Sequence, residues 1–195
     1  MKLEDYFRIK GTYELIDGVY NVKGSVTLIE DVDKLYFKFG TISGDFNCSN
    51  NMLTSLEGAP KSIGGSFFCH NNNLTSLEGC PTSVGGHFIS NYNNLTTLEE
   101  CPSSVGGTFS CEGNKLIKLE GAPIIVGGSF KCSNNNLITL EGAPKQVGGN
   151  FWCNDNKFTS LKGCPISVGK KFYCDDNLHN TKAYRQYLIM NKLRS

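Results

Sequence analysis

The segment Leu116–Asn136, LIKLEGAPIIVGGSFKCSNNN, decides the fold because near-copies of it fill most of the chain. The other copies begin at Leu53, Leu74, Leu95, Leu137 and Phe158, so that successive copies, this segment included, start 21 residues apart. Self-similarity at a short fixed period is typical of a solenoid whose stacked coils bury one shared core. The chain is therefore interpreted by columns, each of which holds the equivalent residues of successive coils.

A strand is predicted in every coil by two columns that stand two residues apart. The first column is Phe throughout, at Phe46, Phe67, Phe88, Phe109, Phe130, Phe151 and Phe172. The second column is Cys with one Ser, at Cys48, Cys69, Ser90, Cys111, Cys132, Cys153 and Cys174. Because side chains alternate along a strand, both columns are expected to point inward and the residue between them outward.

The bend after each strand is marked by an unbroken Asn column. Its members are Asn51, Asn72, Asn93, Asn114, Asn135, Asn156 and Asn177. A buried amide both donates and accepts, so these side chains are expected to bond backbone groups that the bend leaves unpaired.

The rest of each coil is expected to be an extended return segment. Two Leu columns follow the Asn column and supply a second apolar wall. All six prolines fall in one column, which excludes a helix interior there. An Ile or Val column then closes the coil, and glycine pairs such as Gly64-Gly65 let the backbone turn into the next strand.

One stretch resembles a known repeat family. The run GGTFSCEGNKL is similar to the leucine-rich-repeat segment LxxLxLxxNxL, with its matching positions at Gly106, Phe109, Cys111, Asn114 and Leu116. The LxxLEGAP half that follows is similar to the short, helix-free repeats of bacterial effector proteins and of many uncharacterised phage and bacterial proteins. The resemblance covers about residues 32–178 and departs from the family by placing Gly at the first Leu position and Phe at the second.

The resemblance implies a fold and a mode of action. The implied fold is a right-handed, helix-poor leucine-rich-repeat solenoid with a parallel sheet on its concave face and an extended, polyproline-II-like convex side. The implied function is to bind other proteins on the sheet face, and the family serves so many purposes that no partner is implied.

Residues 1–31 depart from the repeat and are expected to form an N-terminal β cap. Tyr13–Val22 contains the turn signal Asp17-Gly18 between two apolar runs, which predicts a hairpin. Val26–Leu28 is expected to be a first repeat strand, one residue out of register with the next coil.

The solenoid itself is expected to occupy residues 32–178 as seven coils of 21 residues. Residues 179–195 are expected to form a C-terminal helical cap that begins at Asn180 or Thr181. Such caps cover the exposed core of the last coil and keep a solenoid soluble.

The composition limits the classes of partner. The 19 basic and 18 acidic residues nearly balance, so no nucleic-acid partner is expected. The opening residues MKLEDYFRIK are charged and hold no apolar run, which predicts no signal peptide, and no segment has the apolar length of a membrane span. A cytoplasmic location is expected, in the host cytoplasm if a phage encodes the chain.

The nine cysteines are interpreted as small buried fillers. Six stand in the strand column, and Cys80, Cys101 and Cys164 replace an Ala found in other coils. Exchange with Ala and Ser is typical of packing residues. An odd number without a CxxC pair argues against a disulfide framework or a metal site, so we expect no cofactor, no metal and a reducing compartment.

No catalytic role is expected. Cys69 has His70 beside it and His87 one coil on, but strand alternation turns Cys69 inward and His70 outward. The glycine pairs lack the Lys and Ser or Thr of a phosphate-binding loop.

A column of like charges is a further feature. It runs through Glu57, Glu78, Glu99, Glu120 and Glu141 and ends with Lys162 in the next coil. We expect local backbone bonds, or lysines such as Lys61 and Lys145, to offset the repulsion.

Functional residues are expected where the outward mid-strand column stops being uniform. That column is Asn47, Phe68, Ile89, Ser110, Lys131, Trp152 and Tyr173. A solvated face has no need of large apolar side chains, and apolar anchors with a polar rim are typical of a protein interface. The alternative is that scattered exposed apolar residues carry no function.

The resulting hypothesis is a non-enzymatic protein-binding module, with a phage or bacterial factor that engages a host protein as the favoured case. The expected anchors are Phe68, Ile89, Tyr92, Trp152 and Tyr173, and the expected polar residues around them are His70, His87, Lys131 and Lys171. Two other classes remain open. One is a structural or self-associating module of a virion or other surface, and the other is an enzyme or a small-ligand or glycan-binding adhesin.

Overall fold

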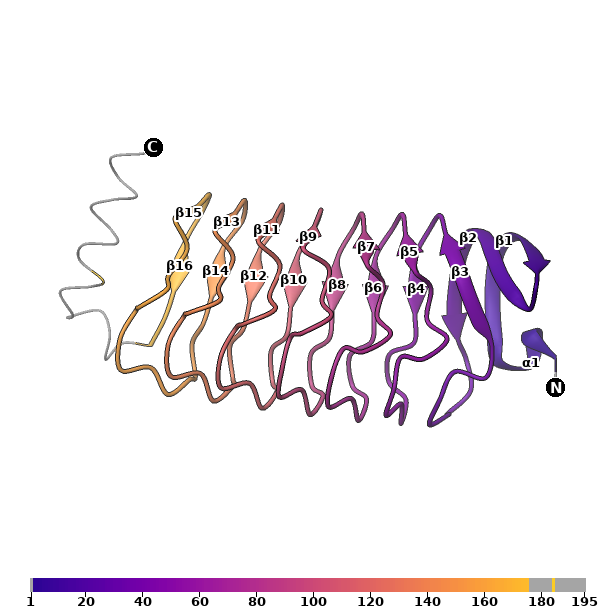
Figure 1. Ribbon diagram of the computed structural model, residues 1–195, viewed down its shortest axis with the longest axis horizontal. Coiled ribbons are helices and arrows are strands. Elements are labelled where there is room, and N and C mark those ends of the chain that lie inside the picture. The colour runs from indigo at the N-terminus through magenta and orange to yellow at the C-terminus, as the bar shows by residue number, and fades with distance from the viewer. Residues whose placement is uncertain (1, 176–183, 185–195) are drawn as a thin grey trace.

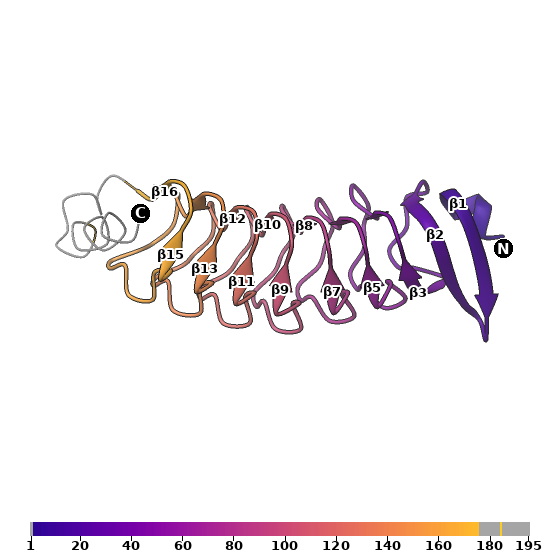
Figure 2. The same ribbon diagram turned by 90° about the horizontal axis from the view of Figure 1, so that it is seen from above.

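The chain forms a helix-poor parallel β-solenoid of about seven coils. The computed structural model describes residues 2–175 and 184. Figures 1 and 2 show the coils stacked side by side along one axis, with a long hairpin at the N-terminal end. Within the described residues, no helix has the length and apolar character needed to cross a membrane.

One row of short parallel strands carries the Phe column. Each strand pairs in register with its equivalent one coil away, so that Phe46 lies opposite Phe67 and Asn47 opposite Phe68. The row consists of β4 (Phe46–Asn47), β6 (Phe67–Phe68), β8 (Phe88–Ile89), β10 (Phe109–Ser110), β12 (Phe130–Lys131), β14 (Phe151–Trp152) and β16 (Phe172–Tyr173).

A second row of parallel strands carries the Ile and Val column. The sequence predicts only that this column closes the coil, whereas the structure makes it a second stretch of sheet. The row consists of β3 (Lys38–Ile42), β5 (Ser62–Ile63), β7 (Ser83–Val84), β9 (Ser104–Val105), β11 (Ile125–Val126), β13 (Gln146–Val147) and β15 (Ser167–Val168).

The glycine pairs form the corner between the two rows. A Cβ on Gly64 would come within 2.4 Å of the carbonyl oxygen of Ser43 in the coil before. The amide of Gly65 donates to the carbonyl of Gly44 at 3.0 Å. The coils approach so closely here that a side chain has no space at the first position of the pair, which explains why this position is Gly from Gly64 to Gly169.

The N-terminal end contains the predicted hairpin, which is longer than the turn signal alone indicates. It follows the short helix α1 (Leu3–Tyr6) and pairs β1 (Phe7–Ile16) with β2 (Val19–Leu28) around Asp17 and Gly18. Both turn residues have positive φ, 49° and 76°, as a tight two-residue hairpin turn requires.

Strand β2 joins the hairpin to both rows. Its first half pairs with β3, and its second half places Val26 opposite Phe46 in β4. The predicted strand at Val26–Leu28 is therefore present, and its separation from the next strand is 20 residues, because Val26 pairs with Phe46.

The core is a stack of phenylalanine rings that runs the length of the solenoid. From Phe46 to Phe151 these rings are 0% exposed. Successive centroids lie between 5.1 and 6.0 Å apart as far as Phe172. The strand column cysteines and the Leu columns pack around this stack, so the apolar columns predicted from the sequence form one continuous core.

Within the described residues, which do not include Asn177, the Asn column behaves as predicted. The Oδ1 of Asn114 accepts from the amide of Leu95, and its Nδ2 donates to the carbonyls of Ser90, Cys111 and Glu112. The same pattern recurs at Asn72, Asn93 and Asn156. Each amide thus bonds its own bend and the coil before it, which ties neighbouring coils together.

The Glu column is exposed and is offset partly by lysines other than those expected from the sequence. Lys118 pairs with Glu120, and Lys162 pairs with Glu141 at 2.9 Å. The amide of Glu57 donates to Ser55 Oγ, a local turn bond that recurs in later coils. The expected backbone bonds are present, and the pairing lysines lie within or beside the column.

The predicted C-terminal helix lies outside the described residues except for Tyr184. The Tyr184 ring packs against Phe172, with centroids 6.5 Å apart. The core at this end therefore contacts a residue from the segment that the sequence assigns to the cap.

Candidate functional site

The outward mid-strand column forms one continuous row on the surface, here called the outer row. Its members are Asn47, Phe68, Ile89, Ser110, Lys131, Trp152 and Tyr173, and each is the strand partner of the next. All are half-buried except Ser110, which is 1% exposed. The structure therefore places five of the expected site residues in one row: Phe68, Ile89, Lys131, Trp152 and Tyr173.

The apolar members of the outer row form two separate groups. Phe68 and Ile89 lie on adjacent strands, and so do Trp152 and Tyr173. Between the groups stand Ser110 and Lys131, so Ile89 and Trp152 lie three strand spacings apart, about 14 Å. The row offers two apolar contact points with a polar gap between them.

Trp152 and Tyr173 form an aromatic stack at one end of the row. Their rings stack with centroids 3.7 Å apart and an interplanar angle of 13°. Aromatic pairs of this kind add roughly 0.5–1.5 kcal/mol beyond the area they bury. The two rings therefore present one preformed aromatic platform on neighbouring coils.

An open hollow of about 470 Å³ lies beside this platform. Its lining residues are Glu112, Ser133, Trp152, Asn154, Asp155, Tyr173, Cys174 and Asp175. Three of these are acidic and none is basic. The carboxylate of Asp175 accepts from the amides of Asp155 and Asn156, which fixes its position at the edge of the hollow.

His70 is positioned next to Phe68 at the other apolar group. The two rings meet edge to face with centroids 6.4 Å apart. Its Nδ1 is buried and has no hydrogen-bond partner among the described residues. Burial lowers the pKa of the His70 imidazole, because the charged form loses solvation that nothing in its surroundings replaces.

Tyr92 lies at the edge of the strand face, in the bend rather than in the outer row. It is 60% exposed and has a left-handed backbone with φ of 52°. The equivalent positions in other coils hold residues that tolerate this conformation, at Asn50, Asn71, Gly113, Asn134 and Asp155. A tyrosine there stores roughly 1–3 kcal/mol of strain, and strained residues cluster at functional sites.

His87 and Lys171 belong to a different structural feature, here called the polar ladder. At the start of each strand, a side chain accepts a hydrogen bond from the amide of the equivalent residue in the next coil. His87 takes part through Nδ1, which accepts from the amide of Thr108 at 2.8 Å. The backbone amide of Lys171 donates to Asn150 Oδ1. The Lys171 side chain carries no acceptor atom, so the ladder ends there.

Sequence reasoning missed the polar ladder although a signal was present. Its accepting members are Ser25, Asp45, Ser66, His87, Thr108, Ser129 and Asn150. Every one of these side chains carries an acceptor atom. The side chain of His87 therefore supports the fold, whatever else it contacts.

The cysteines are buried and unreactive in character. All nine are free, seven are buried, and Cys101 and Cys164 are partly exposed. Burial raises the pKa of Cys48 and of Cys80 to about 12, and it also raises the pKa of Cys69. Since the thiolate is the nucleophile, these residues act as core packing.

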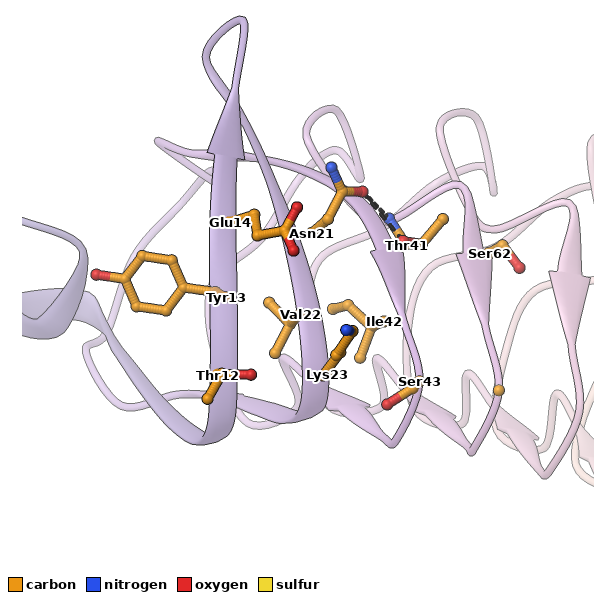
Figure 3. A pocket seen from close by; sticks show the side chains of 11 residues that line it. Thr12, Tyr13, Glu14, Asn21, Val22, Lys23, Thr41, Ile42, Ser43 and Ser62 are labelled. Atoms are coloured by element: carbon orange, nitrogen blue, oxygen red, sulfur yellow. Dashed lines mark hydrogen bonds between the residues drawn. The ribbon is translucent and has the colours of Figure 1, made fainter.

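A second hollow, of about 500 Å³, lies on the outer side of the hairpin and the second strand row (Figure 3). Glu14 and Lys23 line it together with hydroxyl groups, and Asn21 Oδ1 accepts from the amide and the hydroxyl of Thr41. The hollow is lined by both polar and apolar residues and was not indicated by the sequence pattern.

No known family, curated protein or solved structure matches this chain.

Proposed function

We propose that this chain is a protein-binding module that receives its partner on the outer row. The observation that carries the proposal is the preformed platform of Trp152 and Tyr173 beside a hollow with an acidic rim. Half-buried aromatic side chains on a solvent-facing strand row cost hydration without adding to the core, and they are the residues that most often dominate binding energy. The resemblance of Gly106–Leu116 to leucine-rich repeats supports the same function.

The geometry of the outer row defines the partner segment. Five strand spacings separate Phe68 from Tyr173, about 24 Å, which an extended segment of about seven residues would span. The acidic rim favours an arginine or lysine side chain at the Trp152 end, where a cation gains from both the aromatic platform and the carboxylates. The partner segment is thus extended, apolar at one end and basic at the other.

The biological setting belongs to the same proposal. Nine free thiols suit a reducing compartment, so we place the protein in the cytoplasm. The similarity of the repeat to phage and bacterial repeat proteins favours a factor that engages a host protein, by binding rather than by catalysis.

The test compares partner capture by the wild type and by Trp152→Ala/Tyr173→Ala. A control pair of exposed apolar residues is Ile117→Ala/Ile138→Ala, since these isoleucines are 55% and 54% exposed on another side of adjacent coils. We expect a protein that binds to the wild type and to the control variant but not to the Trp152/Tyr173 variant, whose affinity for it is reduced roughly 30-fold or more.

Intrinsic fluorescence supplies a direct readout, because Trp152 is the sole tryptophan. Titration of the protein with the captured partner should change the emission of Trp152. Equal binding by the wild type and the Trp152/Tyr173 variant, both folded, would refute the outer row as the binding site.

A further inference from the structure

The N-terminal end of the sheet is an open edge. Among the described residues, β1 pairs only with β2. The amide of Ile29 donates to the carbonyl of Tyr6, so Tyr6 and every second residue after it turn their backbone groups toward β2. The intervening residues turn their N–H and C=O groups outward. The backbone groups of Ile9, Gly11, Tyr13 and Leu15 have no hydrogen-bond partner in the described part of the chain. Figures 1 and 2 show β1 as the last strand at this end.

The same four residues lie on the core side of the hairpin. Ile9 and Tyr13 lie opposite Val26 and Val22, which are 0% and 3% exposed. Tyr13 itself is 42% exposed, and Leu15 is 56% exposed. The apolar core thus ends at β1 and at Leu3 of α1, whose neighbour Glu4 accepts from the Tyr13 hydroxyl. Strand β1 has exposed side chains and an unpaired outer edge. Proteins seldom leave such an edge open, because it pairs readily with another strand.

We propose that β1 is the contact surface for a second copy of this chain, paired antiparallel about a two-fold axis at Thr12. In this register Ile9 lies opposite Leu15 of the second copy, and Gly11 lies opposite its Tyr13. All the outward N–H and C=O groups of the four open residues find partners. Pairing about Gly11 instead would place Leu15 opposite Phe7, whose amide is already bonded to Leu3.

The side chains of β1 are self-complementary in this register. Lys10 lies opposite Glu14 of the second copy, and the two-fold axis repeats the pair. Both residues are exposed, and neither has an ion-pair partner among the described residues. Tyr13 covers Gly11, whose φ of 131° and close approach to Lys23 exclude a side chain. Opposite charges and an aromatic over glycine are the pairs that stabilise a sheet.

This pattern favours a second copy over a strand from another protein. Lys10 and Glu14 stand at equal distances on either side of Thr12, as do Ile9 and Leu15, which is the requirement of an isologous contact. The result joins two solenoids end to end through one sheet. This inference uses a surface that the proposed function does not use, so the two are tested separately.

Disulfide trapping of the full chain tests the register. Thr12 would face itself in a pair that is not hydrogen-bonded, with Cα atoms about 4.5 Å apart, within the range that a disulfide bridges. We expect Thr12→Cys to form a covalent dimer on mild oxidation. Arg8→Cys is the control on the same strand, since two copies of that residue would stand about 27 Å apart. Equal cross-linking of the two variants would overturn the proposal.

Charge reversal tests the partner. Lys10→Glu and Glu14→Lys each create like-charge pairs in their own dimer, and we expect each dimer to weaken roughly tenfold or more. An equimolar mixture restores opposite charges at both pairs, so the dimer mass should return in light scattering after size exclusion. A wild-type protein that stays monomeric at about 100 µM, or a mixture that behaves as its components, would refute a second copy as the occupant.

Discussion

Replacing the amide of Asn114 should show how strongly the Asn column stabilises the solenoid. Asn114→Ala removes the acceptor for the Leu95 amide, which is then buried without a partner. The three carbonyls that lose Nδ2 keep other bonds, from Asn93, Asn135 and Tyr92. The main loss is therefore one orphaned amide, worth roughly 1–3 kcal/mol, with smaller terms for the weakened carbonyl bonds. We expect unfolding free energy to fall by about 2–4 kcal/mol in total.

The matched variant is Asn114→Asp, which keeps an acceptor but brings a carboxylate to within bonding distance of three carbonyl oxygens. It should be at least as destabilising as Ala at neutral pH, because the carboxylate oxygen that replaces Nδ2 is buried and faces only carbonyl acceptors. Urea denaturation followed by circular dichroism and by Trp152 fluorescence measures both variants, and coincident transitions justify a two-state analysis. A loss below about 0.5 kcal/mol for Asn114→Ala would refute the bond count, since an orphaned buried amide costs more than that.

Three further outcomes are expected. Glu100 has a φ of 69° in a column that is otherwise Gly, so Glu100→Gly should raise the unfolding free energy by about 1 kcal/mol; an unchanged urea midpoint would contradict the strain. The pKa of His70 is lower in the folded state, so as the pH falls the unfolded state binds a proton before the folded state does. The contribution of neutral His70 to stability is therefore fully present above the ordinary pKa of about 6.5 and is lost as the pH falls through the lowered folded pKa. Thermal denaturation between pH 8 and pH 5 should show this loss in the wild type and less of it in His70→Asn, which copies Asn91 of the next coil. The seven buried thiols should react with a thiol reagent slowly and only after opening, because burial raises the thiol pKa values; rapid labelling of thiols other than the partly exposed Cys101 and Cys164 before unfolding would contradict the burial.

The columns that were predicted correctly are those whose role lies within one coil or one strand. Phe109 and Cys111 differ by two residues, and strand alternation alone turns both inward. Asn114 was expected to bond the bend because its amide donates and accepts. The hairpin followed from the local signal Asp17-Gly18.

The features that were missed depend on contacts between coils. The strand Ser83–Val84 has only two residues, which is too short to show alternation, and its pairing with the neighbouring coils makes it a strand. The sequence predicts His87 as an interface residue because it stands near Phe68 and Ile89, whereas in the structure its Nδ1 accepts from an amide that lies 21 residues further on. The strain at Tyr92 was indicated only by the Asn, Gly and Asp residues of its column, which favour a left-handed backbone.

Strand β2, which pairs with both strand rows, has a consequence for how the chain folds. The coils are so alike that any one of them could stack on the wrong neighbour and still bury a Phe, a Leu and an Asn in equivalent places. The hairpin has no such ambiguity, because its turn is local and Val26 pairs with Phe46 at a spacing that no other coil repeats. Local hairpins form early, in about 1–10 µs. Folding should therefore begin at the N-terminal end and add coils in sequence order, so that removal of the hairpin would leave the remaining copies free to assemble out of register.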